Sequence, residues 1–77
     1  EFVLAPNPAQ SSVIVLTKNN EPFSYEIYHL SGKVVLHGKA LSGQSILLDE
    51  TMGNGAYFVH LKSETCLYTT QKLIISK

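Results

Sequence analysis

Short runs of β-branched and aromatic residues, each bounded by turn residues, dominate this chain of 77 residues. No window of about 11 residues repeats its apolar residues with helical spacing, so no amphipathic helix is expected. The breaks between runs are rich in Gly, Pro, Asn, Asp and Ser, which favour turns. This pattern predicts an all-β, antiparallel sandwich or barrel. The expected strands are Phe2–Ala5, Ser12–Thr17, Phe23–Leu30, Lys33–Lys39, Ser45–Leu48, Ala56–Lys62 and Leu67–Ile75.

The clearest local unit is a hairpin in "FSYEIYHLSGKVVLHG". A two-residue loop at Ser31-Gly32 predicts its register. The expected pairs are Leu30 with Lys33, Tyr28 with Val35 and Glu26 with His37. Strand alternation then predicts a core face and an outer face. The core face would hold Tyr25, Ile27, Val34 and Leu36, and the outer face Glu26, Tyr28, Leu30, Lys33, Val35 and His37.

A second unit, "GNGAYFVHLK", predicts a strand that follows a tight turn at its glycines. Alternation should direct Tyr57, Val59 and Leu61 toward the core, and Phe58 and His60 away from it. The last strand is expected to pair with this one through the turn "SETC".

The end of the chain, "TTQKLIISK", has the composition of a strand that belongs in a sheet. Terminal residues of small domains commonly fray. An aliphatic run between Lys72 and Lys77 therefore predicts that these residues have a structural or recognition role.

Length and charge restrict the function. We expect one domain, residues 1–77, with a net stability of about 5 kcal/mol or less. Six basic residues balance six acidic ones, and all six bases are lysines. The absence of Arg and of a basic excess argues against nucleic-acid binding. The chain has no initial Met and no signal-peptide pattern, so we interpret it as a fragment of a longer protein.

Candidate catalytic and metal-binding groups are few. Asp49 and Glu50 are adjacent, so on a strand their carboxylates would project to opposite faces and could not share a proton. We expect His29 on the core side of the hairpin and His37 on the outer side, and His60 could meet His37 only by a favourable strand order. Cys66 is the sole cysteine, which excludes an internal disulfide and a cysteine-based zinc site. No catalytic site, metal or cofactor is expected.

Segments in a particular order suggest a family. They are "LAPNPAQSSVIV", "YEIYHLSGKVV", "GNGAYFVHLK" and "QKLIISK". This order resembles the C-terminal sorting domain of the type IX secretion system of Bacteroidetes, also called the Por secretion system. Family members look like "YPNPA", then "V-I-Y-D-L-x-G-K-x-V", then "G-x-Y-x-V-x-I", then a basic final strand. The chain departs from this pattern at Ala5, His29 and Ser31.

The resemblance implies an immunoglobulin-like sandwich of about seven strands at the end of a larger cargo protein. Such domains carry the parent protein from the periplasm across the outer membrane to the cell surface or the medium. The implied partners are the outer-membrane translocon and a sortase-like cysteine protease, which removes the domain and links the cargo to lipopolysaccharide. The resemblance implies that the candidate partner-binding residues are the positions that match the family motifs: Pro6, Asn7, Pro8, Gly32, Lys33, Gly55, Tyr57, Lys72 and Lys77.

The physical properties of two segments agree with this resemblance. Pro6-Asn7-Pro8 is expected to be extended and stiff, at the border between a linker and the first firmly paired strand. The last strand is a candidate docking edge for a partner strand, and edge pairing could also produce a dimer. The alternative function is an accessory sandwich of a secreted enzyme, as a spacer or a carbohydrate-binding module. A carbohydrate module would need an exposed planar row of aromatic rings.

Overall fold

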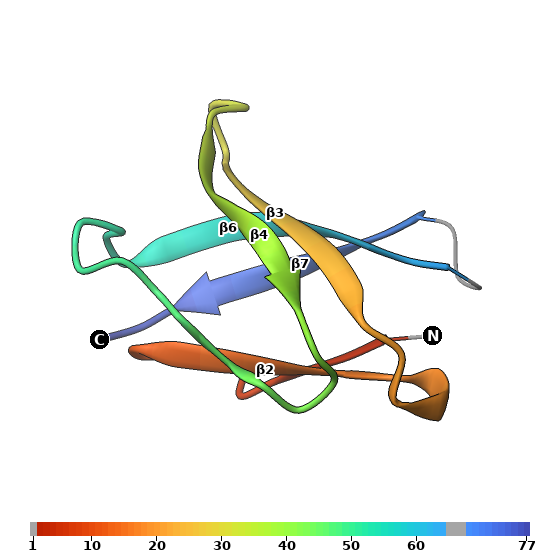
Figure 1. Cartoon of the computed structure of the whole chain (residues 1–77). Coiled ribbons are helices and arrows are strands. Elements are labelled where there is room, and N and C mark those ends of the chain that lie inside the picture. Colours follow the sequence, from red (N-terminus) through yellow and green to blue (C-terminus); the bar gives the residue numbers. More distant parts are fainter. Residues whose placement is uncertain (1, 65–67) are drawn as a thin grey trace.

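Two antiparallel sheets pack face to face in the computed structural model, which describes residues 2–64 and 68–77 (Figure 1). The described residues form seven strands and one 3₁₀ helix, Lys18–Asn20. The strands are β1 (Phe2–Ala5), β2 (Ser12–Thr17), β3 (Phe23–His29), β4 (Val34–Ala40), β5 (Ser45–Leu47), β6 (Gly55–Ser63) and β7 (Tyr68–Ile75). Every expected strand is present, and the described strand ends shift by at most one residue. Leu67, expected to begin the last strand, lies outside the described residues.

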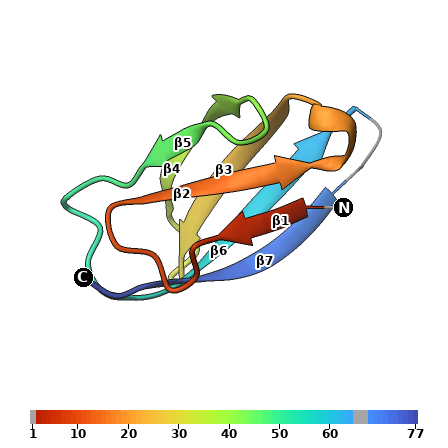
Figure 2. The ribbon, with the colours of Figure 1, turned by 90° about the horizontal axis from the view of Figure 1, so that it is seen from below.

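The strand order shows a sandwich and not a closed barrel. One sheet has the order β1-β2-β5 and the other has the order β4-β3-β6-β7, with antiparallel pairing throughout. Figure 2 shows β1 and β7, the first and last strands, along the same side of the molecule. A parallel bridge between Ala9 and Ile75 joins the two ends of the chain there.

The core lies between the sheets and is built from alternate residues of the long strands. Val13 and Val15 of β2 face Val59 and Leu61 of β6, and each of these side chains is at most 2% exposed. The rings of Phe2 and Phe23 meet edge to face at 6.3 Å. As predicted, Tyr57, Val59 and Leu61 point inward, whereas Phe58 is 40% exposed. Burying one such aliphatic side chain stabilises a fold by roughly 1.5–3 kcal/mol.

The turn of the β3–β4 hairpin differs from the expected one. The His29 carbonyl accepts a hydrogen bond from the Gly32 N–H, and the His29 N–H donates to the Lys33 carbonyl, both at 2.8 Å. The loop therefore contains three residues, and Gly32 adopts a φ of 93°, which a residue without a Cβ adopts readily. The predicted pair of Leu30 with Lys33 is wrong, because the sequence does not distinguish a two-residue loop from a three-residue loop at "LSG".

A register shift between Ile27 and Tyr28 changes which side chains of the same hairpin face the core. Glu26 is opposite His37 as predicted, but Tyr28 pairs with Val34 and not with Val35. An extra residue on one strand reverses the alternation beyond it. Val35 consequently packs against the core and Val34 is 38% exposed, which is the opposite of the prediction for these two valines.

The terminal strand contributes to the core, and we predict a large loss of stability when the Leu73 side chain is shortened. This side chain is fully buried, so Leu73→Ala should lower the free energy of unfolding by about 2–5 kcal/mol. Leu47 is 75% exposed and serves as the matched control, with an expected change within about 0.5 kcal/mol. Urea unfolding followed by circular dichroism measures both variants. Equal stability of Leu73→Ala and the wild type would contradict the buried position of β7.

Candidate functional site

The described histidines do not form a metal site. His37 and His60 lie on opposite sides of Glu26, one strand away on each side. His29, expected to face the core, is instead exposed at the end of β3, where its ring meets Tyr57 edge-on at 5.6 Å. Within residues 2–64 and 68–77, no group of three or more His, Cys, Asp or Glu side chains could hold a metal ion.

The adjacent carboxylates, Asp49 and Glu50, lie at a turn before β6. Asp49 Oδ1 accepts a hydrogen bond from the Thr51 N–H at 2.9 Å and so closes a turn. This hydrogen bond lowers the pKa of the exposed Asp49 carboxyl below its usual value, and the charge of Lys77 lowers the pKa further. Glu50 is exposed in the same turn. Cys66 lies outside the described residues.

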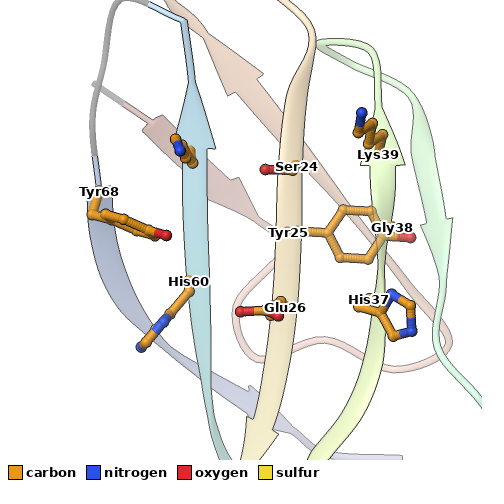
Figure 3. A pocket seen from close by; sticks show the side chains of 9 residues that line it. Ser24, Tyr25, Glu26, His37, Gly38, Lys39, His60 and Tyr68 are labelled. Atoms are coloured by element: carbon orange, nitrogen blue, oxygen red, sulfur yellow. The ribbon is translucent and has the colours of Figure 1, made fainter.

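The outer face of the four-stranded sheet carries the exposed aromatic side chains. Figure 3 shows the hollow on this face, with Tyr68, His60, Glu26 and His37 around it. The rings of Tyr28 and His60 are 4.7 Å apart and tilted by 47°, and those of His60 and Tyr68 are 6.5 Å apart at 72°. These rings do not form the planar row that a carbohydrate module would need.

One interaction on this face is a charged hydrogen bond. The Tyr28 hydroxyl donates to Glu26 Oε1 at 2.9 Å, and this bond raises the pKa of Tyr28 because it favours the protonated phenol. The Glu26 carboxylate thus already has a hydrogen-bond partner.

No helix among the described residues is long and apolar enough to cross a membrane.

The terminal strand is ordered to its end, as the sequence predicts. β7 is an edge strand of the larger sheet, and it pairs with β6 from Tyr68 to Ile75. Leu73 and Ile75 are at most 1% exposed. Gln71 Nε2 also donates to the carbonyl of Phe2 at 3.0 Å, which connects β7 to β1.

A segment near the start of the chain covers the free edge of this strand, and we call Asn7–Ala9 the clip. The Asn7 side chain accepts from the Ile74 N–H at 3.0 Å and donates to the Lys72 carbonyl at 2.8 Å. The backbone of Ala9 donates to the Ile74 carbonyl and accepts from the Ser76 N–H. An Asn side chain thus supplies the donor and acceptor that a neighbouring strand would supply.

The motif that contains the clip therefore has a different role from the expected one. Pro6, Asn7 and Pro8 form bends and are exposed, and both peptide bonds that precede the prolines are cis. β1 precedes them and is paired with β2 from Phe2 to Ala5. The prediction of an extended border before the first paired strand is wrong, because the segment connects two paired strands and reaches across to β7.

The loop before β6 also binds the end of the chain. The Lys77 N–H donates to Asn54 Oδ1 at 2.8 Å, and Lys77 Nζ donates to the Glu50 carbonyl at 3.2 Å. Sequence reasoning missed Ala9, Glu50 and Asn54 as partners of the tail. The only available signal was Asn54 between two glycines, and it indicated a turn rather than a hydrogen-bond acceptor.

The other motif positions have structural contacts. Gly55 enters β6 with a φ of 140°, opposite Ile75. The buried Tyr57 pairs with Leu73, and its hydroxyl donates to the Gly53 carbonyl at 2.8 Å. Lys33 lies beside Gly32 in the hairpin turn and lines a hollow together with Tyr57 and Asn54. Of the motif residues, Asn7, Gly55 and Tyr57 therefore contact β7 directly, whereas Gly32 and Lys33 lie in the hairpin turn.

We predict that the clip controls access to the chain end. Asn7→Ala removes both side-chain hydrogen bonds and should cost about 1–2 kcal/mol of stability. It should also accelerate removal of the last residues by carboxypeptidase, because the tail opens locally more often. Asn7→Asp keeps the acceptor for Ile74 but loses the donor to Lys72, so an intermediate rate is expected. Gln10→Ala, at an exposed neighbour, is the control; an Asn7→Ala rate equal to that of the control would refute the clip.

The comparisons with known proteins agree with this arrangement. A family model described as a secretion system C-terminal sorting domain matches residues 3–76. No curated protein matches the chain. Domains of this family are non-catalytic; the type IX secretion machinery recognises them and secretes the parent protein across the outer membrane. The family match, the seven-stranded sandwich and the ordered tail show that the chain belongs to the type IX secretion system C-terminal sorting domains.

Proposed function

We propose that residues 1–77 are one sorting domain at the C-terminal end of a larger cargo protein, and that the export machinery recognises it folded. The observation that carries this proposal is the order of β7, which is paired with β6 and hydrogen-bonded by the clip and by the loop before β6. A surface that is already ordered binds its receptor more tightly, because less conformational entropy is lost on binding.

The finer steps belong to the same proposal. The cargo reaches the periplasm, the outer-membrane translocon binds the folded domain, and the cargo emerges at the cell surface or in the medium. A sortase-like cysteine protease then removes the domain. The family match supports these roles.

The motif residues divide into three proposed roles. Lys72 and Lys77 have exposed side chains close to the chain end, so we assign them to contact with the receptor. Asn7, with Pro6 and Pro8 on either side, holds the strand in place. Gly32, Lys33, Gly55 and Tyr57 shape the turns and the core.

We predict that this chain is sufficient for export and that its last strand is necessary. Residues 1–77 are fused behind a reporter that carries a periplasmic signal peptide, in a bacterium with the type IX system. The intact fusion should appear outside the outer membrane, and deletion of residues 72–77 should leave the reporter in the periplasm. The control is the same fusion in a strain without the translocon.

A second variant separates recognition from folding in that assay. The deletion removes Leu73 and Ile75 from the core and therefore also destabilises the domain. The double substitution of Lys72 and Lys77 to Gln changes exposed side chains, and it should lower export several-fold while the domain remains folded. Full export of both variants would rule out recognition through the terminal strand.

A further inference from the structure

The backbone of β7 presents two sets of hydrogen-bonding groups. In an antiparallel strand, the N–H and C=O of one residue point to one neighbour, and those of the next residue point the other way. Ile74 uses both groups for the clip, so it faces away from β6. By the same alternation, Tyr68, Thr70 and Lys72 also direct their backbone groups away from β6, toward the free edge.

The clip covers part of this edge and leaves the rest open. Its hydrogen bonds extend from the Lys72 carbonyl to the Ser76 N–H. Among the described residues, the Thr70 N–H and C=O and the Lys72 N–H have no hydrogen-bond partner at the edge. The tail beyond Lys72 is thus already paired, whereas residues 68–72 form an unpaired strand edge.

The side chains beside the open edge have a basic and aromatic character. Tyr68 is 71% exposed, and Lys62 Nζ lies 5.4 Å from the centre of its ring. Lys72 is exposed opposite Phe58, which is 40% exposed. Neither β6 nor β7 contains an acidic residue. Glu26 lies two strands away from β7 (Figure 3), and its carboxylate accepts a hydrogen bond from the Tyr28 hydroxyl.

We propose that the open edge, Tyr68–Lys72, accepts an extended acidic segment of a receptor in the export machinery as an added strand. This inference rests on the proposed function and specifies where the receptor binds. Backbone hydrogen bonds to Thr70 and Lys72 supply affinity in this mode of binding, and side chains supply specificity. An acidic side chain of the incoming strand lies beside Lys72, and an apolar one lies beside Tyr68 at the other end of the open edge.

The clip determines the extent of the added strand. Asn7 occupies the edge from the Lys72 carbonyl onward, so the added strand ends there and the tail remains folded onto the clip. The docking surface is therefore the first half of β7. The sequence alone suggested the whole last strand, and it did not show that the tail already has a partner.

Substitution of Thr70 by proline tests this inference. Thr70→Pro removes an N–H that β6 does not use, and proline is tolerated on an edge strand when its nitrogen faces outward. The matched control is His37→Pro in β4, the other edge strand of the same sheet. The backbone groups of His29 point toward β4, so by alternation those of Glu26 point toward β6. His37 is opposite Glu26, and its N–H therefore also points outward, away from β3. The reporter fusion measures export, and urea unfolding measures the stability of each variant.

The expected result is export at least tenfold lower for Thr70→Pro, near wild-type export for His37→Pro, and similar stability of the two variants. Lys72→Glu should also lower export, whereas Lys18→Glu, at an exposed lysine in the 3₁₀ helix, should not. Normal export of Thr70→Pro would overturn the inference. It would leave the proposed function intact, which fails only if the intact fusion is not exported or the tail is dispensable.

A second copy of this chain is the other possible occupant of the edge, and sedimentation of the purified domain distinguishes it. A dimer that Thr70→Pro dissolves while export continues would assign the edge to self-association and overturn the receptor proposal. A domain that sediments as a monomer, together with the loss of export in Thr70→Pro, supports it.

Discussion

The hydrogen bonds between the clip and β7 connect residues near the two ends of the chain, and the rest of the arrangement depends on them. Asn7 binds the Lys72 carbonyl and the Ile74 N–H, and Ala9 binds the groups that follow. An edge strand with unpaired backbone groups can pair nonspecifically with strands of other chains. The clip satisfies these groups at the tail, so Leu73 and Ile75 stay in the core and the open edge is limited to residues 68–72.

Most of the fold was predictable from the sequence, because the relevant signals are local. Turn residues mark the breaks between strands, and the alternation of Tyr57, Val59 and Leu61 identifies the inner face of β6. The orientations of Val34 and Val35, which are the reverse of the expected ones, were not predictable. A register shift of one residue depends on how the hairpin packs on the core, and the composition of the strand is compatible with either register.

The site was less predictable than the fold, because its contacts join distant parts of the chain through backbone groups. Asn7 could be identified from its motif, but nothing in "PNPA" indicates that its amide binds a strand 65 residues away. Ala9, Glu50 and Asn54 hold the tail through backbone atoms or a single side-chain oxygen. Residue type gives little information about such contacts until the strands have been placed.

A sorting domain works by being bound, so its last residues must already form part of the sandwich before any receptor arrives. Amide hydrogen exchange of the isolated domain, resolved by residue, measures this directly. We expect the amides of Leu73 to Ile75 to be protected to the same degree as those in the centre of β6. Exchange of these amides at the rate of an unstructured peptide, while β6 stays protected, would contradict this expectation.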